Sequence, residues 1–151
     1  MAQPASFLPI AGMMFLAGIG IPVMATLNAG LGQQLGSPIA ATFVLCSVAV
    51  VLAGLAVMIT GVPAAGSFSF DRPQLYAGAL FFLFHAFSIT WAAPRIGVGN
   101  AVFFVLLGQL VAAAAIDHFG WMGAIRTTLT HRRLFGLLVM AAGVYLARKQ
   151  A

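Results

Sequence analysis

Few side chains in this sequence of 151 residues have the chemistry of a catalytic or metal site, and their spacing does not assemble one. The acidic residues number two, Asp71 and Asp117, and the one cysteine is Cys46. Hydrolysis by paired carboxylates, zinc binding and nucleophilic catalysis each need a set of reactive side chains that the sequence lacks. His118 stands beside Asp117, but neighbouring residues on a helix point about 100° apart. We therefore expect neither an enzyme nor a bound metal or cofactor.

Several polar side chains lie within apolar stretches. In "FFLFHAFSITWAAPR", His85, Ser88 and Trp91 recur every three residues and Arg95 follows after four, which places them on one face of a helix. A single polar stripe on a phenylalanine-rich helix predicts a wall that faces a cavity. Histidine ordinarily exchanges a proton near neutral pH, so His85 is either a proton carrier or a histidine packed within the protein.

Two further apolar stretches carry polar side chains. Thr26 and Asn28 follow Pro22 in the first stretch, where they either contact a solute or form hydrogen bonds between helices. Asn100 and Gln109 are nine residues apart and point to opposite faces of an ideal helix, so they do not line one cavity unless Gly108 distorts the helix. We expect Gln109 on a solute path and Asn100 at a gate or helix end.

Asp117 directly follows the apolar run "LVAAAAI". We interpret it as the point where a helix leaves an apolar environment. There its carboxylate stays hydrated, bonds backbone groups at the turn into Gly120, or pairs with an arginine such as Arg126. A gate or a site for a coupling ion is the alternative interpretation.

The composition indicates what surrounds these residues. Hydrophobic residues make up 62% of the chain and charged residues 6%, whereas soluble domains have about 45–50% and about 25%. So few charges cannot cover a water-soluble surface, and we expect an integral membrane protein in contact with membrane lipids. The net charge of +5 does not indicate nucleic-acid binding, because five of the seven basic residues lie at or after Arg126 and no basic run alternates with stacking aromatic residues.

Five apolar stretches approach the length that a membrane-crossing helix needs, roughly 20 residues. They lie at residues 8–31, 38–60, 74–93, 98–116 and 134–147, and they predict an all-α membrane protein with one five-helix domain over residues 1–151. Ser37 and Pro38 suit the start of the second helix, Pro94 the end of the third and Gly120 the end of the fourth. The last stretch is short, but basic side chains at its ends can reach the membrane surface. These are Arg132, Arg133, Arg148 and Lys149.

A proline and several small residues mark where helices bend or pack. Pro22 removes a backbone hydrogen bond inside the first stretch and predicts a kink, which is either a functional hinge or a packing feature. Gly108 and Ala112 are four residues apart, and Gly136 and Gly143 are seven apart, so each pair shares a helix face. Such faces suit close packing between helices or subunits.

Five crossings would place the two termini on opposite sides of the membrane. Four basic residues would then lie on the side of the N-terminus and three on the other. They are Arg72, Arg126, Arg132 and Arg133 on the first side, and Arg95, Arg148 and Lys149 on the second. Because the side richer in Lys and Arg normally faces the cytoplasm, this balance barely orients the chain. It favours a cytoplasmic N-terminus by a small margin, or insertion in both orientations and an antiparallel dimer; a balance by chance is the third interpretation.

Three segments carry a family resemblance: "IPVMATLNAGLGQQLGSPIAATF", "APRIGVGNAVFFVLLGQLVAAAAIDHFGWMG" and "RRLFGLLVMAAGVYL". Together they cover about half of the chain, and it resembles the YdcZ-type branch of the drug/metabolite transporter superfamily, relatives of the small multidrug resistance proteins. The resemblance implies a five-helix unit of the bacterial inner membrane that works as a homodimer, a heterodimer with a homologous chain, or a fused ten-helix chain. Small multidrug proteins use a glutamate in the first helix. This chain has no glutamate, so their proton/cation exchange is not carried over.

These observations predict a small secondary transporter of the bacterial inner membrane that moves a small organic solute as a dimer. The alternative is a non-transporting membrane subunit or lipid-interacting scaffold that requires a partner chain. With no acidic residue in the middle of an apolar stretch, a strongly cationic solute is not favoured. The sequence does not specify the substrate, the coupling ion or the choice between homodimer and heterodimer.

Overall fold

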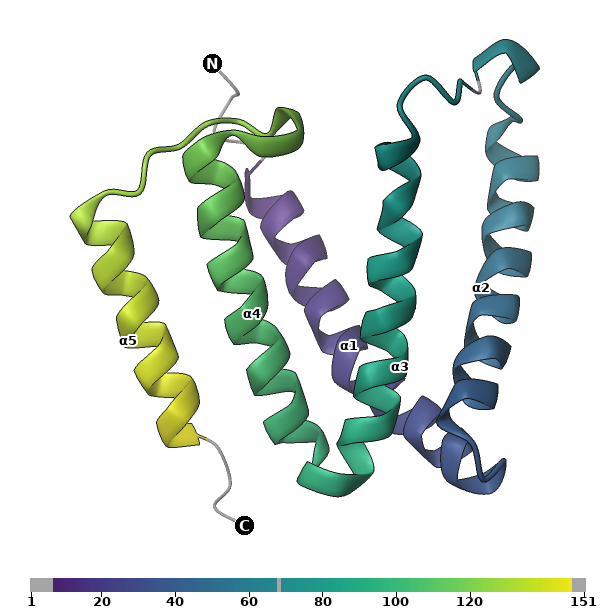
Figure 1. Ribbon diagram of the computed structural model, residues 1–151, viewed down its shortest axis with the longest axis horizontal. Coiled ribbons are helices and arrows are strands. Elements are labelled where there is room, and N and C mark those ends of the chain that lie inside the picture. Colours follow the sequence, from purple (N-terminus) through teal and green to yellow (C-terminus); the bar gives the residue numbers. More distant parts are fainter. Residues whose placement is uncertain (1–6, 68, 148–151) are drawn as a thin grey trace. The chain divides into compact units, whose positions relative to one another are not determined.

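The computed structural model describes residues 7–67 and 69–147, and every regular element in this part of the chain is helical (Figure 1). Its α-helices are α1 (Phe7–Gln34), α2 (Pro38–Thr60), α3 (Gly78–Ile96), α4 (Val98–Phe119) and α5 (His131–Ala147). Short 3₁₀ turns lie at η2 (Ala65–Ser67), η3 (Pro73–Ala77) and η4 (Trp121–Gly123). The expectation of an all-α protein is confirmed.

Four of these helices, α1 to α4, are long and apolar enough to cross a membrane. The third span is counted from Pro73 to Ile96 and so includes the 3₁₀ turn before α3. Helix α5 has 17 residues. At 1.5 Å per residue it is about 25 Å long, which is shorter than a hydrocarbon core of about 30 Å. Arg132 and Arg133 lie in its first turn, whereas Arg148 and Lys149 lie outside the described residues. A fifth crossing therefore stays a prediction.

Several helices extend past their apolar stretches. Helix α1 continues from the expected end at residue 31 to Gln34, α4 from 116 to Phe119, and α5 begins at His131 rather than at 134. Helix α3 begins later than expected because Pro73–Ala77 forms a 3₁₀ turn first. The apolar pattern marks only the part of a helix that avoids water, while backbone hydrogen bonding continues until a residue breaks it.

Local chemistry explains where α2 and α4 begin and end. The Ser37 hydroxyl oxygen accepts a 3.2 Å hydrogen bond from the Ala40 N–H, and Pro38 is the first helical residue. Gly61, with φ of 106°, ends α2. Gly120 is left-handed, with φ of 66°, and its N–H donates to the Ile116 carbonyl at the end of α4. The predicted roles of Ser37 and Pro38 at the start of α2 and of Gly120 at the end of α4 are confirmed.

Pro94 does not end α3, contrary to the expectation. The helix continues through Pro94 to Ile96, and Gly97, with φ of 84°, follows it. Proline costs the helix one backbone hydrogen bond here, and the last turn of a helix already leaves its carbonyls without helical partners. The carbonyl that loses its helical donor to Pro94 is that of Thr90, and the Arg95 guanidinium donates to the next carbonyl, that of Trp91.

The chain divides into two compact units, of which the first ends at Arg95 and the second begins at Ile96. In the first unit α1 packs against α2, and the turn that joins them lies at the same end as the last turn of α3 (Figure 1). In the second unit α4 packs against α5, and the loop through η4 joins them (Figure 1). One domain over residues 1–151 stays a prediction.

The buried apolar residues described in the two units are alanines apart from Ile89. Among the described residues they are Ala25, Ala29, Ala41, Ala86, Ile89, Ala93, Ala101 and Ala114. Large apolar side chains lie at the surface instead; Phe43 is 72% exposed and Phe81 is 71% exposed. A water-soluble protein buries such side chains, whereas lipid solvates them and small residues let the helices approach. The distribution fits a protein surrounded by a bilayer.

Candidate functional site

A buried hydrogen-bond chain joins α1 to α3 in the first unit. The Asn28 amide donates to the Thr90 hydroxyl oxygen at 2.5 Å, and that hydroxyl donates to the Ala86 carbonyl at 2.7 Å. Asn28 is 5% exposed and Thr90 is 1% exposed. Of the two interpretations for Asn28, the bond between helices is therefore observed, and its contact with a solute stays a prediction.

Gly32 allows the three helices of this unit to meet. A Cβ atom at Gly32 would lie 3.3 Å from the Thr90 methyl carbon and 3.5 Å from the Pro38 Cα. Thr90 belongs to α3 and Pro38 begins α2, so one glycine of α1 touches both neighbours. The end of the unit at which α1 turns into α2 is thus fixed by close backbone packing.

At this end lies a cavity of about 390 Å³, which we call the polar cavity. It is lined by the last turns of α1 and α3 and by the turn that begins α2. The lining residues are Ala29, Gly32, Gln33, Gly36, Pro38, Thr90, Pro94 and Arg95. The Thr90 hydroxyl is already engaged in the chain described above, so Gln33 and Arg95, both exposed, supply the side chains able to bind a solute.

Arg95 brings a positive charge to the polar cavity. Its guanidinium carbon lies 4.2 Å from the centroid of the Trp91 ring, and one of its N–H groups donates to the Trp91 carbonyl. Within the described residues, the one ion pair joins Arg133 to Asp117, and the Asp71 carboxylate accepts a hydrogen bond from Ser69. The charge of Arg95 is therefore not balanced by a carboxylate in the described part of the chain.

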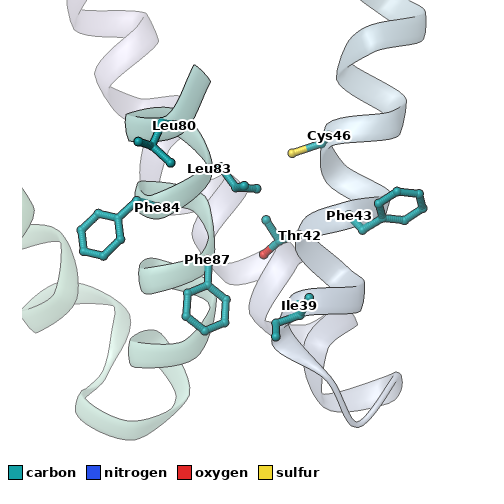
Figure 2. Close-up of a pocket in the computed structure, with 8 residues that line it drawn as sticks. All are labelled: Ile39, Thr42, Phe43, Cys46, Leu80, Leu83, Phe84 and Phe87. Carbon is teal, nitrogen blue, oxygen red and sulfur yellow. The ribbon is translucent and has the colours of Figure 1, made fainter. Parts of the chain in front are cut away.

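A second cavity, of about 510 Å³, lies between α2 and α3 (Figure 2). We call it the apolar cavity. Its lining residues are Ile39, Thr42, Phe43, Cys46, Leu80, Leu83, Phe84 and Phe87. Figure 2 shows Leu83 pointing from α3, and Thr42 and Cys46 from α2, into the space between the helices. The Thr42 hydroxyl donates to the Pro38 carbonyl at 2.8 Å, so its hydrogen is used within α2.

The two cavities follow one another along the same two helices. On α3, Phe87 lines the apolar cavity and Pro94 the polar cavity, and residues seven apart lie on one helix face. On α2, the neighbours Ile39 and Pro38 line them in the same order. A molecule in the polar cavity thus has an apolar space next to it.

Of the predicted polar stripe of α3, Arg95 lines the polar cavity and the other three residues lie elsewhere. At about 100° per residue, His85, Ser88 and Trp91 are on the side of α3 largely opposite to Thr90 and Ala93, which are buried. His85 and Ser88 are half-buried and Trp91 is 48% exposed. Neither cavity described above is lined by them. The predicted path lining by these residues stays a prediction.

Thr26 and Pro22 interact within their own helix. The Thr26 hydroxyl donates to the Pro22 carbonyl at 2.8 Å, and Thr26 is exposed. Helix α1 continues through Pro22. Such a hydroxyl-to-carbonyl bond one turn away is typical of helices that bend. The hinge at Pro22 and a solute contact of Thr26 stay predictions.

Asp117 ties the end of α4 to the start of α5 in the second unit. Its carboxylate forms a 2.5 Å ion pair with Arg133, and its backbone carbonyl accepts from the Thr127 N–H at 2.9 Å. Pairing with an arginine, one of the expected alternatives, is therefore observed, whereas Arg126, the example given, donates to the His118 carbonyl at 3.3 Å. The arginine is Arg133 rather than Arg126 because the loop after α4 returns α5 to this end and so brings Arg133 to the carboxylate.

His118 also anchors this loop. Its Nδ1 atom accepts a 3.1 Å hydrogen bond from the Leu129 N–H. The adjacent Phe119 stacks on Trp121, with ring centroids 4.9 Å apart. The side chains after "LVAAAAI" thus serve the connection between two helices. A gate or coupling-ion role for Asp117 stays a prediction.

The remaining predicted positions lie on α4 and α5. The Asn100 amide donates to the Ile96 carbonyl at 2.9 Å, at the junction of α3 and α4. On α4, Gln109 and the pair Gly108 and Ala112 are exposed. On α5, Gly136 and Gly143 are exposed and lie on the side opposite the leucines that face α4. The path role of Gln109 and the packing roles of the small residues stay predictions.

The sequence predicted no binding role for Gln33, Thr90 or Arg95. Arg95 was placed on the polar stripe only. A signal for Thr90 existed, since a buried amide such as Asn28 requires a partner, but several hydroxyls could have supplied it. Gln33 stands at the end of an apolar run, where a polar residue is ordinary. Among the described residues, no group of three or more His, Cys, Asp or Glu side chains could hold a metal.

The fold and this site define an all-helical membrane protein with apolar outer surfaces and a polar cavity at one end of its first three helices. Residues 9–146 match the family model described as "Putative inner membrane exporter, YdcZ", and the chain belongs to this family. It is therefore an integral protein of the inner membrane, from a family of transporters rather than enzymes. The predicted family resemblance is confirmed. No curated protein and no solved structure matches the chain.

Proposed function

We propose that this protein is a small secondary transporter that moves a small organic solute across the inner membrane as a dimer. The observation that carries the proposal is the exporter-family match, which begins within α1 and ends within α5. The polar cavity supports it, because a transporter needs a polar binding place among membrane-length helices. The described residues offer Gln33 and Arg95 there, with the first turn of α2 beside them.

The position of the polar cavity supports an antiparallel pair. It lies at the end of the first unit where α1 turns into α2, so one chain presents it toward one membrane surface. A second chain in the opposite orientation would present the same cavity toward the other surface, which is the symmetry that alternating access uses. The nearly equal numbers of basic residues on the two sides favour the same arrangement.

Flux from liposomes tests transport. The purified chain is reconstituted into liposomes loaded with a mixture of small organic solutes, and the solutes retained are measured by mass spectrometry. We expect at least one solute to be lost faster than from protein-free liposomes and from liposomes with heat-inactivated protein. Equal retention in all three would favour the alternative, a membrane subunit or lipid-interacting scaffold that requires a partner chain.

Labelling from each side of the membrane tests the antiparallel homodimer. Thr128 lies in the exposed loop between α4 and α5, and Cys46 is the one native cysteine. A Thr128→Cys variant in a Cys46→Ser background is labelled with a membrane-impermeant maleimide from outside and then after permeabilisation. We expect two populations of similar size. Labelling from one side only would remove the antiparallel homodimer and leave a homologous chain as the partner.

A further inference from the structure

We propose that the first unit binds an amphipathic organic anion, with the anionic group at Arg95 and the apolar body between α2 and α3. The inference rests on the proposed function for one point, that this molecule is the transported solute. The observation behind it is the succession of two cavities of opposite character along one pair of helices.

The charge of the site favours an anion. Arg95 is the one ionisable side chain in the lining of the polar cavity, and no carboxylate of the described residues pairs with it. Its position is fixed by the Trp91 ring beneath it and by the bond to the Trp91 carbonyl. A guanidinium that is held in place and retains free N–H groups suits a carboxylate or phosphate. Helix α2 begins at Pro38 in the lining, so the positive end of its helix dipole also lies at this cavity.

The apolar cavity defines the rest of the molecule. Its lining consists of aliphatic and aromatic side chains with Cys46 and Thr42, and the hydroxyl hydrogen of Thr42 is used within its own helix. A space of about 510 Å³ accepts a short alkyl or aryl group. Phe87 and Pro94 share one face of α3. The alkyl or aryl group of a molecule whose anionic group is at Arg95 can therefore extend along this face into the apolar cavity. A hydrophilic anion would leave this space unused.

A bilayer lipid has the same chemistry, an anionic head joined to an apolar tail. We commit to a soluble solute because both cavities are of small-molecule size, about 390 and about 510 Å³. A phospholipid with two long acyl chains exceeds both. The experiment below separates the two sources.

Trp91 provides the signal. The chain has two tryptophans, Trp91 and Trp121, so a Trp121→Phe background leaves one, directly under Arg95. The purified chain in phosphatidylcholine nanodiscs is titrated with hexanoate, with the neutral analogue hexanamide, and with acetate, which lacks the apolar body. We expect a saturable change of Trp91 fluorescence with hexanoate, and a half-saturating concentration at least about tenfold higher for each analogue.

Matched variants locate both parts of the site. Arg95→Gln should weaken hexanoate binding at least about tenfold, and Arg95→Lys should restore much of it. Arg132→Gln removes the same charge from the exposed first turn of α5 and should leave binding unchanged. Cys46→Phe should fill the apolar cavity and reduce the preference for hexanoate over acetate. Ser47→Phe adds the same ring to an exposed neighbour outside the lining and should not.

Three results would overturn the inference. The first is equal hexanoate affinity in the Arg95→Gln and Arg132→Gln variants. The second is equal affinity for hexanoate and hexanamide. The third is loss of a co-purifying anionic phospholipid in Arg95→Gln, seen by native mass spectrometry, with unchanged hexanoate binding, which would make Arg95 a lipid contact.

The liposome flux experiment separates this inference from the proposed function. If a cationic or neutral solute moves at the same rate in Arg95→Gln and wild type and no anionic solute moves, the transporter stands, and the point that the bound anion is the transported solute fails. If hexanoate binding depends on Arg95 but no solute moves, the site stands and transport fails.

Discussion

The side-chain amide of Asn28 on α1 lies 2.5 Å from the hydroxyl oxygen of Thr90 on α3 and donates a hydrogen bond to it. The two residues are 62 positions apart in the sequence. Their bond is a buried polar contact between α1 and α3, in a unit whose described core is otherwise built largely of alanines. It also fixes Thr90 at the wall of the polar cavity, so packing and the candidate site share one side chain.

Thr90→Val should destabilise the first unit. The substitution keeps the shape of the side chain but removes the acceptor of the Asn28 amide, which is 5% exposed and would lose its partner. Hydrogen bonds between membrane helices contribute about 0.6 kcal/mol on average and up to about 1.7, so we expect a loss of about 1 kcal/mol in the free energy of unfolding in detergent–denaturant mixtures.

Thr26→Val is the matched control, because the Thr26 hydroxyl is exposed and bonds only within its own helix. It should change the free energy of unfolding by much less. A double-mutant cycle with Asn28→Ala and Thr90→Val should show coupling. Additive effects of these two substitutions would contradict a direct bond between them.

Gly32→Ala should be less stable than Gly30→Ala. A new Cβ at Gly32 meets the Thr90 methyl carbon at 3.3 Å, while one at Gly30 meets nothing within 4 Å. Thr90 cannot easily turn its methyl group aside, because its hydroxyl is engaged with Asn28 and Ala86. Both variants gain the same helix propensity, so their difference, about 1 kcal/mol, isolates the overpacking. Thermal unfolding measures it, and equal melting temperatures would refute the close contact.

Breaking the Asp117–Arg133 pair should loosen the connection between α4 and α5 at a small cost in stability. The two side chains are 35% and 32% exposed, so water screens the pair and its contribution is at most about 1 kcal/mol. We expect Asp117→Asn to increase proteolysis in the loop between the two helices, while solute flux stays within about twofold of wild type. A complete loss of flux in a folded Asp117→Asn protein would instead favour a gate or coupling-ion role.

The sequence leaves His85 on α3 either a proton carrier or a histidine packed within the protein, and the pH dependence of transport distinguishes the two. If it carries a proton, flux in wild type should vary between about pH 5 and 8, and His85→Ala should abolish that variation. His131→Ala, at the exposed start of α5, serves as the control and should keep the wild-type profile. A flux that does not depend on pH in either wild type or His85→Ala would argue against coupling through His85.

The apolar stretches were sufficient to predict the helices, because a backbone surrounded by lipid must satisfy its own hydrogen bonds. Local chemistry was sufficient for several boundaries: Ser37 and Pro38 begin α2, and Gly120 ends α4. The prediction that α3 ends at Pro94 was wrong, since a proline in the last turn removes one backbone hydrogen bond and the helix continues to Ile96. These are effects of residues close in sequence, and the sequence displays them directly.

Contacts between distant residues required the tertiary structure. The sequence indicated that Asn28 needs a partner, but it could not select Thr90 from the other hydroxyls of the apolar stretches. The sequence indicated an arginine as a partner of the Asp117 carboxylate, but the path of the loop brings Arg133 to it and not Arg126. The succession of the polar and apolar cavities depends on how three helix ends meet around Gly32. Sequence alone determined that this chain is a helical membrane protein, because the preference for lipid or water is a property of each stretch by itself. Only the tertiary structure decided which side chains meet, because that depends on how whole helices rotate and approach one another.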